Sequence, residues 1–187
     1  NPGGTVSFRH PRFGTLYFAL QDVRIQQVPS TDALASRRIA QAVGRNDAGQ
    51  VMEAARWALH HGLLPQFYEG VRKALEIDPQ HSDALHVMEL KRRMEQPLDE
   101  RPEQEEELRR MIRKSDMTFK RSAHFLLMHD TPELPVGPRK KSRADERLEL
   151  LETVYEAFLL RFSAQGVELE IPRERLKVVL FSNHSDF

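Results

Sequence analysis

The segment from Ser142 to Phe181 constrains this chain most, because its pattern predicts a long amphipathic helix followed by a strand. Apolar residues recur at alternating spacings of three and four, which places them on one helical face. They are Leu148, Leu151, Tyr155, Phe158 and Phe162. Ser142 and Asp145 fit a capping box at the helix start, and Gly166 fits its end. We therefore expect the whole stripe, Phe158 included, to pack on a sheet.

Strands are predicted on both sides of this helix. The apolar run from Leu176 to Phe181 is typical of a buried strand. Upstream, the run from Phe119 to His129 predicts a strand whose second half is buried, ended by Thr131-Pro132. Residues 117–187 should therefore form a strand, long helix and strand, which is a βαβ-type layer.

Residues 1–29 predict a small β-sheet. Thr5–His10 alternates, Gly14–Phe18 follows a turn, and Val23-Arg24-Ile25 with Val28 offers a third strand. Three short strands bury little surface alone, so we expect this sheet to lie against the next part of the chain.

Residues 30–96 contain start and stop signals for four helices joined by short connections. Short connections favour antiparallel packing of neighbouring helices. The start signals are Ser30 or Thr31, then Asn46 or Asp47, then Pro65, then Ser82 or Asp83; the stop signals are Gly44, Gly62, Asp78-Pro79 and Pro97. In the fourth helix we expect Leu85, Met88 and Met94 to face inward. The piece Ala74–Pro79 resembles the end of a tetratricopeptide repeat, but no second copy follows at that period. We interpret the region as a degenerate antiparallel helical array.

Residues 97–116 form a charge run in which acids precede bases. It fits an acidic docking segment, or a solvated linker that passes into a short helix, and the macrodipole favours the second. We place a domain boundary here. The predicted fold class is therefore α+β, with a small N-terminal sheet, a helical middle and a C-terminal α/β layer.

Composition bounds the partners. The 187 residues include 28 basic and 28 acidic side chains and no cysteine. Because the positive and negative charges cancel and no aromatic residue is interleaved in the basic loop 137–143, we expect no nucleic-acid binding. No apolar run reaches the ~20 residues that span a bilayer. Without cysteine there are no disulfides and no thiolate metal ligands.

Few residues suggest chemistry. His184 and Asp186 share a face if the last strand continues, which makes a weak half-site; a polar chain end explains them more simply. Trp57, Phe67 and Tyr68 could line a groove for a protein or peptide partner, although core packing also explains them. HExxH, Walker A, GxGxxG and GxSxG motifs are absent from the sequence. We therefore assign no catalytic residue, metal site or cofactor, and enzymatic activity stays open.

Three stretches carry a family resemblance: His124–Thr131, Ala144–Phe158 with its Tyr155-Glu156-Ala157-Phe158 turn, and Leu176–Phe181 with Phe187. Together they resemble the opening of a gluzincin-like zinc-metallopeptidase domain, closest to a bacterial family of unknown function found in large exported proteins. The resemblance implies a strand, a long helix and a strand, with the zinc-binding HExxH further along. It also implies an extracytoplasmic location, and an edge strand that pairs with extended substrate.

The sequence stops at Phe187 before any HExxH, so no catalytic or metal residue is carried over. Three hypotheses remain. The chain is a non-catalytic N-terminal region of a metallopeptidase-type protein, or a freestanding helical interaction module of tetratricopeptide type, or a small enzyme that uses His184 and Asp186. The sequence gives neither the partner nor the oligomeric state.

Overall fold

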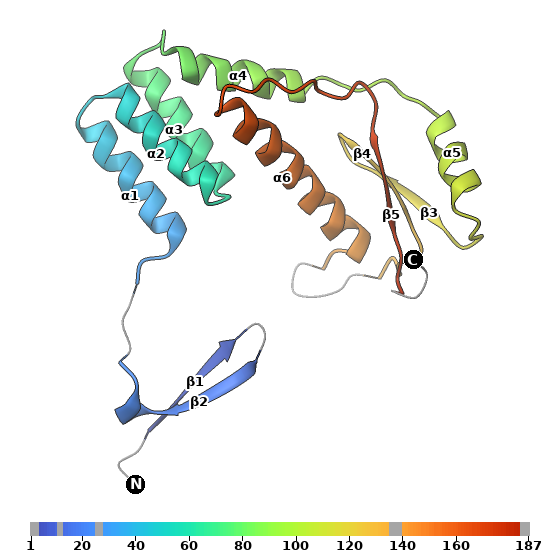
Figure 1. Cartoon of the computed structure of the whole chain (residues 1–187), viewed down its shortest axis with the longest axis horizontal. Helices are drawn as coiled ribbons and strands as arrows, with labels where there is room; N and C mark the ends of the chain where they lie inside the picture. The colour runs from blue at the N-terminus through green and yellow to red at the C-terminus, as the bar shows by residue number, and fades with distance from the viewer. Residues whose placement is uncertain (1–3, 11–12, 25–27, 135–139, 184–187) are drawn as a thin grey trace.

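The computed structural model describes residues 4–10, 13–24, 28–134 and 140–183. It has a small antiparallel sheet at the N-terminus, helices in the middle and a mixed sheet with a long helix at the C-terminus (Figure 1). The predicted α+β class is confirmed.

The N-terminal sheet is a two-stranded ribbon of β1 (Thr5–His10) and β2 (Gly14–Ala19). Its register sets Val6 opposite Phe18 and Phe8 opposite Leu16, so one face is apolar. A short 3-10 turn, η1 (Leu20–Asp22), follows instead of a third strand. Val23, Arg24 and Val28 lie outside any strand, and Ile25 falls outside the described residues.

The ribbon does not lie against the helices as we expected. It stands apart from them in Figure 1, and Phe8 and Phe18 remain 54% and 40% exposed. The apolar face is therefore uncovered within the described part of the chain.

Four helices follow: α1 (Thr31–Gly44), α2 (Ala48–His60), α3 (Leu64–Ile77) and α4 (Ser82–Met94). Asp47 caps α2, because its carboxylate accepts a hydrogen bond from the Gln50 backbone N–H at 3.0 Å. Gly62 ends α2 with a φ of +74°, a conformation that favours glycine. The N-cap of α4 is His81, neither Ser82 nor Asp83.

The core of the array is built mainly from small and branched residues of α2 and α3, which pack closely side by side. The three residues of α4 that we expected to face inward differ: Met94 is buried, Met88 is half-buried against the core, and Leu85 is 43% exposed. The apolar cluster does not stop at the array. It continues into Leu148 and Leu160 of α6 and Phe125 and Leu127 of β4, so these helices and the C-terminal layer share one core.

The C-terminal sheet has the order β3-β4-β5, with β3 (Thr118–Arg121) antiparallel and β5 (Leu176–Leu180) parallel to β4 (Phe125–His129). The single strand that we predicted over 119–129 is in fact two strands. The chain turns between them, and the Ser122 backbone N–H donates to the Phe125 carbonyl at 3.0 Å. β4 is fully buried, whereas β5 is an edge strand and only half-buried, so the expectation of a buried last strand is wrong.

The long helix α6 (Arg143–Ser163) joins β4 to β5 as predicted. Its capping box is confirmed: Ser142 Oγ accepts from the Asp145 N–H at 3.2 Å, and Asp145 accepts from the Ser142 N–H at 3.3 Å. Gly166, with a φ of +77°, lies just beyond its end.

The buried face of α6 differs from the predicted stripe. Leu148, Tyr155, Leu159 and Leu160 are buried, whereas Phe158 is 51% exposed. The reason is that α6 contacts α2 and α4 of the array as well as β4. Because the array covers a second side of α6, Leu159 and Leu160 are buried and Phe158 lies outside the buried face.

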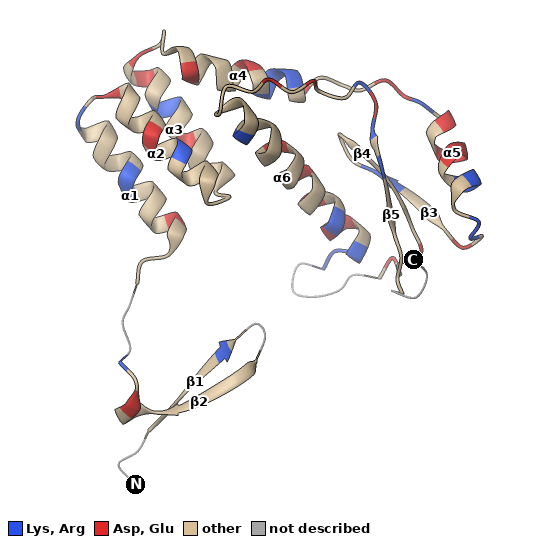
Figure 2. Cartoon of the chain, viewed as in Figure 1, with Lys and Arg blue, Asp and Glu red and all other residues tan. Residues whose placement is uncertain are grey.

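The charged segment 97–116 passes into a short helix as predicted, with acids in the first turn and bases in the last, but the segment is not solvated throughout. It contains α5 (Glu103–Met111), which covers the sheet face opposite α6. Leu108 and Gln104 are 2% and 4% exposed, and Leu108 packs with Leu126 and Met128 of β4. Acids of this segment pair with bases in the sheet or directly before it: Glu105 with Arg121 of β3, Glu107 with Lys177 of β5, and Glu100 with Arg175, which precedes β5. Figure 2 marks acidic residues of α5 in red and basic residues of the strands in blue.

Candidate functional site

Two cavities adjoin on either side of Gln96-Pro97-Leu98, the stretch that leads out of α4. The larger, of about 570 Å³, lies between this stretch, the start of β4 and α6. The smaller, of about 410 Å³, lies between the same stretch and the segment that enters β5. Both are therefore formed where the helical array meets the C-terminal layer.

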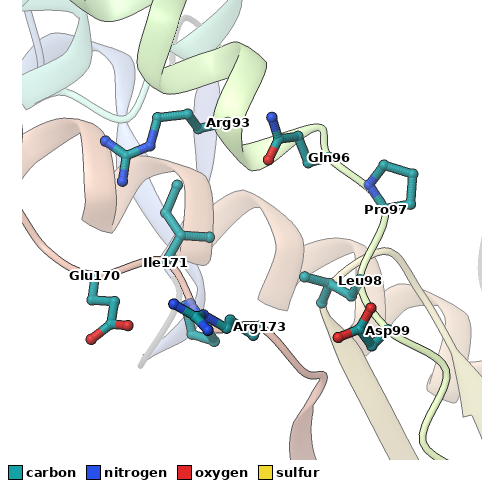
Figure 3. Close-up of a pocket in the computed structure, with 9 residues that line it drawn as sticks. Arg93, Gln96, Pro97, Leu98, Asp99, Glu170, Ile171 and Arg173 are labelled. Atoms are coloured by element: carbon teal, nitrogen blue, oxygen red, sulfur yellow. The ribbon is translucent and has the colours of Figure 1, made fainter.

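Figure 3 shows the smaller cavity, with Arg93 at the end of α4 and Glu170 and Arg173 on the segment before β5. Asp99 adds a second acid, so two guanidinium groups and two carboxylates line it. These charges balance, and the cavity has no preference for an anion or a cation.

The His124 side chain at the larger cavity is held at both of its ring nitrogens. Its Nδ1 lies 2.6 Å from Glu152 Oε2, and its Nε2 lies 2.7 Å from the Met94 carbonyl oxygen. Its backbone N–H also donates to Glu152 Oε1 at 2.8 Å. Both ring nitrogens face oxygen acceptors. His124 thus clamps α4, β4 and α6 together, and it keeps no ring nitrogen free to take a proton from a substrate.

Glu152 and Tyr155 complete the clamp. Burial alone would raise the pKa of Glu152, but the hydrogen bonds that it accepts, including those from His124, outweigh burial and lower it. The Tyr155 ring stacks on His124 with centroids 4.3 Å apart. Burial, and then the charge of Glu152, raise the pKa of Tyr155, and its buried hydroxyl has no hydrogen-bond partner among the described residues.

Tyr68, predicted as a partner-binding residue, contacts two residues that line this cavity but does not line it itself. Its hydroxyl donates to Glu156 Oε1 at 2.5 Å, and Lys91 Nζ lies 4.5 Å from its ring centroid. Burial, and then the hydrogen bond to Glu156, raise the pKa of Tyr68. The residue is 8% exposed, so it reaches the cavity only through these neighbours.

The structure does not bring the three predicted aromatic residues into one groove. Trp57 is half-buried between Arg38, 4.5 Å from its ring centroid, and His61, which stacks on it at 3.9 Å. Phe67 is 1% exposed and belongs to the core. A partner-binding role for Trp57 and Tyr68 stays a prediction. His184 and Asp186, the weak polar candidates, lie outside the described residues.

A histidine and a serine elsewhere in the structure, His86 and Ser163, resemble part of a catalytic arrangement. His86 Nε2 lies 2.8 Å from Ser163 Oγ, the separation of a serine nucleophile and its base. Within the described ranges no third group orients the His86 ring, and the nearby N–H groups of Ala164 and Gly166 already donate to carbonyl oxygens. The pair therefore lacks both the orienting group and the oxyanion donors of a hydrolase.

The sequence did not reveal the His124–Glu152 pair, because 28 residues separate its members. No group of three or more His, Asp or Glu side chains that could hold a metal occurs in the described part of the chain. No helix in those ranges has the length and apolarity to cross a bilayer.

Comparisons with protein-family models, curated proteins and solved structures found no match to this chain.

Proposed function

We propose that this chain is the non-catalytic N-terminal region of a gluzincin-like metallopeptidase-type protein, which scaffolds the zinc-bearing part and binds a substrate or partner. The observation that carries the proposal is an exposed apolar ridge on α6. It consists of Leu150, Val154 and Phe158, which are 49%, 55% and 51% exposed. We call these three residues the α6 ridge.

The spacing of the ridge makes it a continuous surface. Its members are four residues apart, so they are neighbours on successive helical turns. Phe158 also packs against Phe162 with ring centroids 4.6 Å apart, which extends the strip by another turn. Scattered exposed apolar residues need no explanation, but a contiguous strip marks a surface that another element covers. A helix that packs along this strip would bury all three side chains.

The position of the ridge fits the proposal as well. It lies on the layer β4-α6-β5, the part of the chain that resembles the opening of a gluzincin-like domain. The β5 strand is a half-buried edge, which leaves room for an extended segment to pair with it. An extracytoplasmic location and any peptidase activity of the larger protein rest on the resemblance alone.

The freestanding helical module is the weaker proposal. Such a module needs a core of its own, yet α2 and α4 contact α6, and the array shares one apolar cluster with it. The array on its own would expose part of that cluster.

Two measurements test the proposal. The reading frame downstream of the codon for Phe187 should encode an HExxH motif, and a stop codon with no such motif would overturn the proposal. The second test uses the lack of cysteine in the sequence: Val154→Cys places a single thiol on the α6 ridge. In the protein extended through its downstream segment, we expect this thiol to resist alkylation, whereas in the present chain it should react quickly.

Glu149→Cys is the matched control, because Glu149 is exposed on the side of α6 away from the ridge. Its thiol should react at the same rate in both proteins. Equal reaction of the Val154→Cys thiol in the long and short proteins would show that nothing downstream covers the ridge.

A further inference from the structure

We propose that the larger cavity binds a cationic group carried on an apolar stem, such as an arginine or lysine side chain or a free alkylamine. No residue of this cavity belongs to the α6 ridge, and the inference does not depend on the function proposed above.

Its charges are the first argument. Four carboxylates line it: Glu95, Glu100, Glu152 and Glu156. The basic side chains that line it are Lys91, Arg175 and His124. The acids therefore outnumber the bases, and the site favours a cation.

The pairing of these charges singles out one carboxylate. Lys91 Nζ lies 3.4 Å from Glu95 Oε1, and Arg175 Nη1 lies 3.0 Å from Glu100 Oε1. The clamp described above pairs His124 with Glu152. Among the described residues, no cation pairs with Glu156.

Glu156 is held in position, although it has no cation. The Tyr68 hydroxyl donates to its Oε1 at 2.5 Å and fixes the carboxylate at the cavity wall. Within the described ranges its Oε2 accepts no hydrogen bond, so a ligand can donate to it. A fixed carboxylate with a free oxygen is the acceptor that an ammonium or guanidinium group needs.

Tyr155 also lines this cavity, and its hydroxyl has no hydrogen-bond partner among the described residues. The residue is 8% exposed, and its hydroxyl is buried. A buried hydroxyl without a partner costs free energy, so an N–H donor that reached it would gain more than an ordinary hydrogen bond. Tyr155 and Glu156 are adjacent on α6, and both line the cavity.

The rest of the lining suits an apolar stem. Met94, Pro97 and Leu98 come from the end of α4 and the stretch after it, and Ala123 comes from the turn before β4. A volume of about 570 Å³ lies within the range of small-ligand pockets. Lysine and arginine carry their charge on such a stem and commonly lay it along an apolar surface.

The test is a titration of the whole chain followed by the amide NMR signals of Ala123 and Thr153, which both line the cavity. The probes for a peptide side chain are Nα-acetyl-arginine methylamide and Nα-acetyl-lysine methylamide, and n-pentylamine is the probe for a free amine. Nα-acetyl-norleucine methylamide has a similar stem without the charge. We expect saturable shifts with at least one cationic probe and none with norleucine.

Two variants locate the site. Glu156→Gln keeps an acceptor for Tyr68 but removes the charge, and it should weaken binding by roughly tenfold or more. Thr153→Arg supplies a cation within the chain, three residues from Glu156, and should abolish binding. Glu149→Gln, a change on the same helix outside the cavity, should leave binding unaltered.

Each outcome decides the matter. Binding of pentylamine alone supports the site and identifies the ligand as a free amine, whereas binding of the amino-acid probes identifies a peptide side chain. Equal binding of norleucine, full binding by Glu156→Gln, or no shift with any cationic probe would overturn the proposal. If Glu156→Gln fails to fold, the exposed change Thr153→Arg carries the test, and undiminished binding by it would overturn the site.

Discussion

A side chain at position 70 would collide with Ala55: a Cβ atom built on Gly70 of α3 lies 2.7 Å from the Ala55 Cβ of α2. Ile39 Cδ1 of α1 is also near, at 3.5 Å. Three of the four helices of the array, α1, α2 and α3, therefore converge at a point where only glycine fits. The closest packing in the array depends on the absence of one methyl group.

The first prediction rests on this contact. Gly70→Ala should lower the free energy of unfolding by about 1–3 kcal/mol, because overpacking forces the two helices apart. Gly44→Ala is the control: it lies in the last turn of α1 with nothing within 4 Å of its added Cβ. That change should be neutral or stabilising by up to about 1 kcal/mol. Urea denaturation of both variants checks the difference, and equal effects would show that α2 and α3 are not in close contact.

The second prediction concerns the two sides of α6. Leu159→Ala should cost about 2–5 kcal/mol, because Leu159 is 5% exposed in the shared core. Phe158→Ala should cost about 1 kcal/mol or less in this chain, because half of the ring is exposed. Denaturation midpoints compare the two. A larger loss of unfolding free energy for Phe158→Ala than for Leu159→Ala would mean that Phe158 is buried, as the sequence predicted, and that the α6 ridge belongs to the core.

The third prediction concerns pH and Glu152. Its pKa is lower in the folded protein than the ordinary value of 4.5, so the folded state binds this proton less readily than the unfolded state. The stabilisation is therefore complete above the unfolded pKa and is lost as the pH falls through the folded value. Unfolding of the wild type and Glu152→Gln, measured at about pH 7 and about pH 3, should show a gap in stability that narrows on acidification. A gap that is constant or widens would contradict the role of the charged carboxylate.

The fourth prediction concerns the start of α6. Ser142→Ala removes the hydroxyl that accepts from the Asp145 N–H and should cost about 0.5–2 kcal/mol. Ser30→Ala is the matched change at the N-cap of α1, where the serine side chain makes no capping hydrogen bond. Its effect on thermal unfolding should be clearly smaller. Similar losses for both would mean that the capping box contributes nothing to α6.

Local signals predicted the elements well, because caps and turns depend on residues close in sequence. Ser142 with Asp145, Asp47, Gly62 and Gly166 all act where their chemistry indicates. The turn between β3 and β4 was missed because its residues, Ser122-Ala123-His124, include neither glycine nor proline.

The features that could not be predicted depend on distant partners. Phe158 and Leu159 are both apolar, and only the position of the array decides which one is buried. The cavity has the same origin, because its lining residues Met94 and His124 are 30 residues apart, and no periodicity in the sequence links them. We predicted that the acids of α5 are solvated, because the bases that pair with them lie far along the chain in β3 and β5.

The shared core has a consequence for how the chain is made. A ribosome delivers α1 to α4 first, at roughly 5–20 residues per second, and α6 only later. Until Leu159 and Leu160 arrive, the newly made array has an uncovered apolar side. The helical array therefore exposes apolar surface, and is prone to aggregate, until the second half of the chain has left the exit tunnel. A chaperone that shields α2 and α4 would act in that interval.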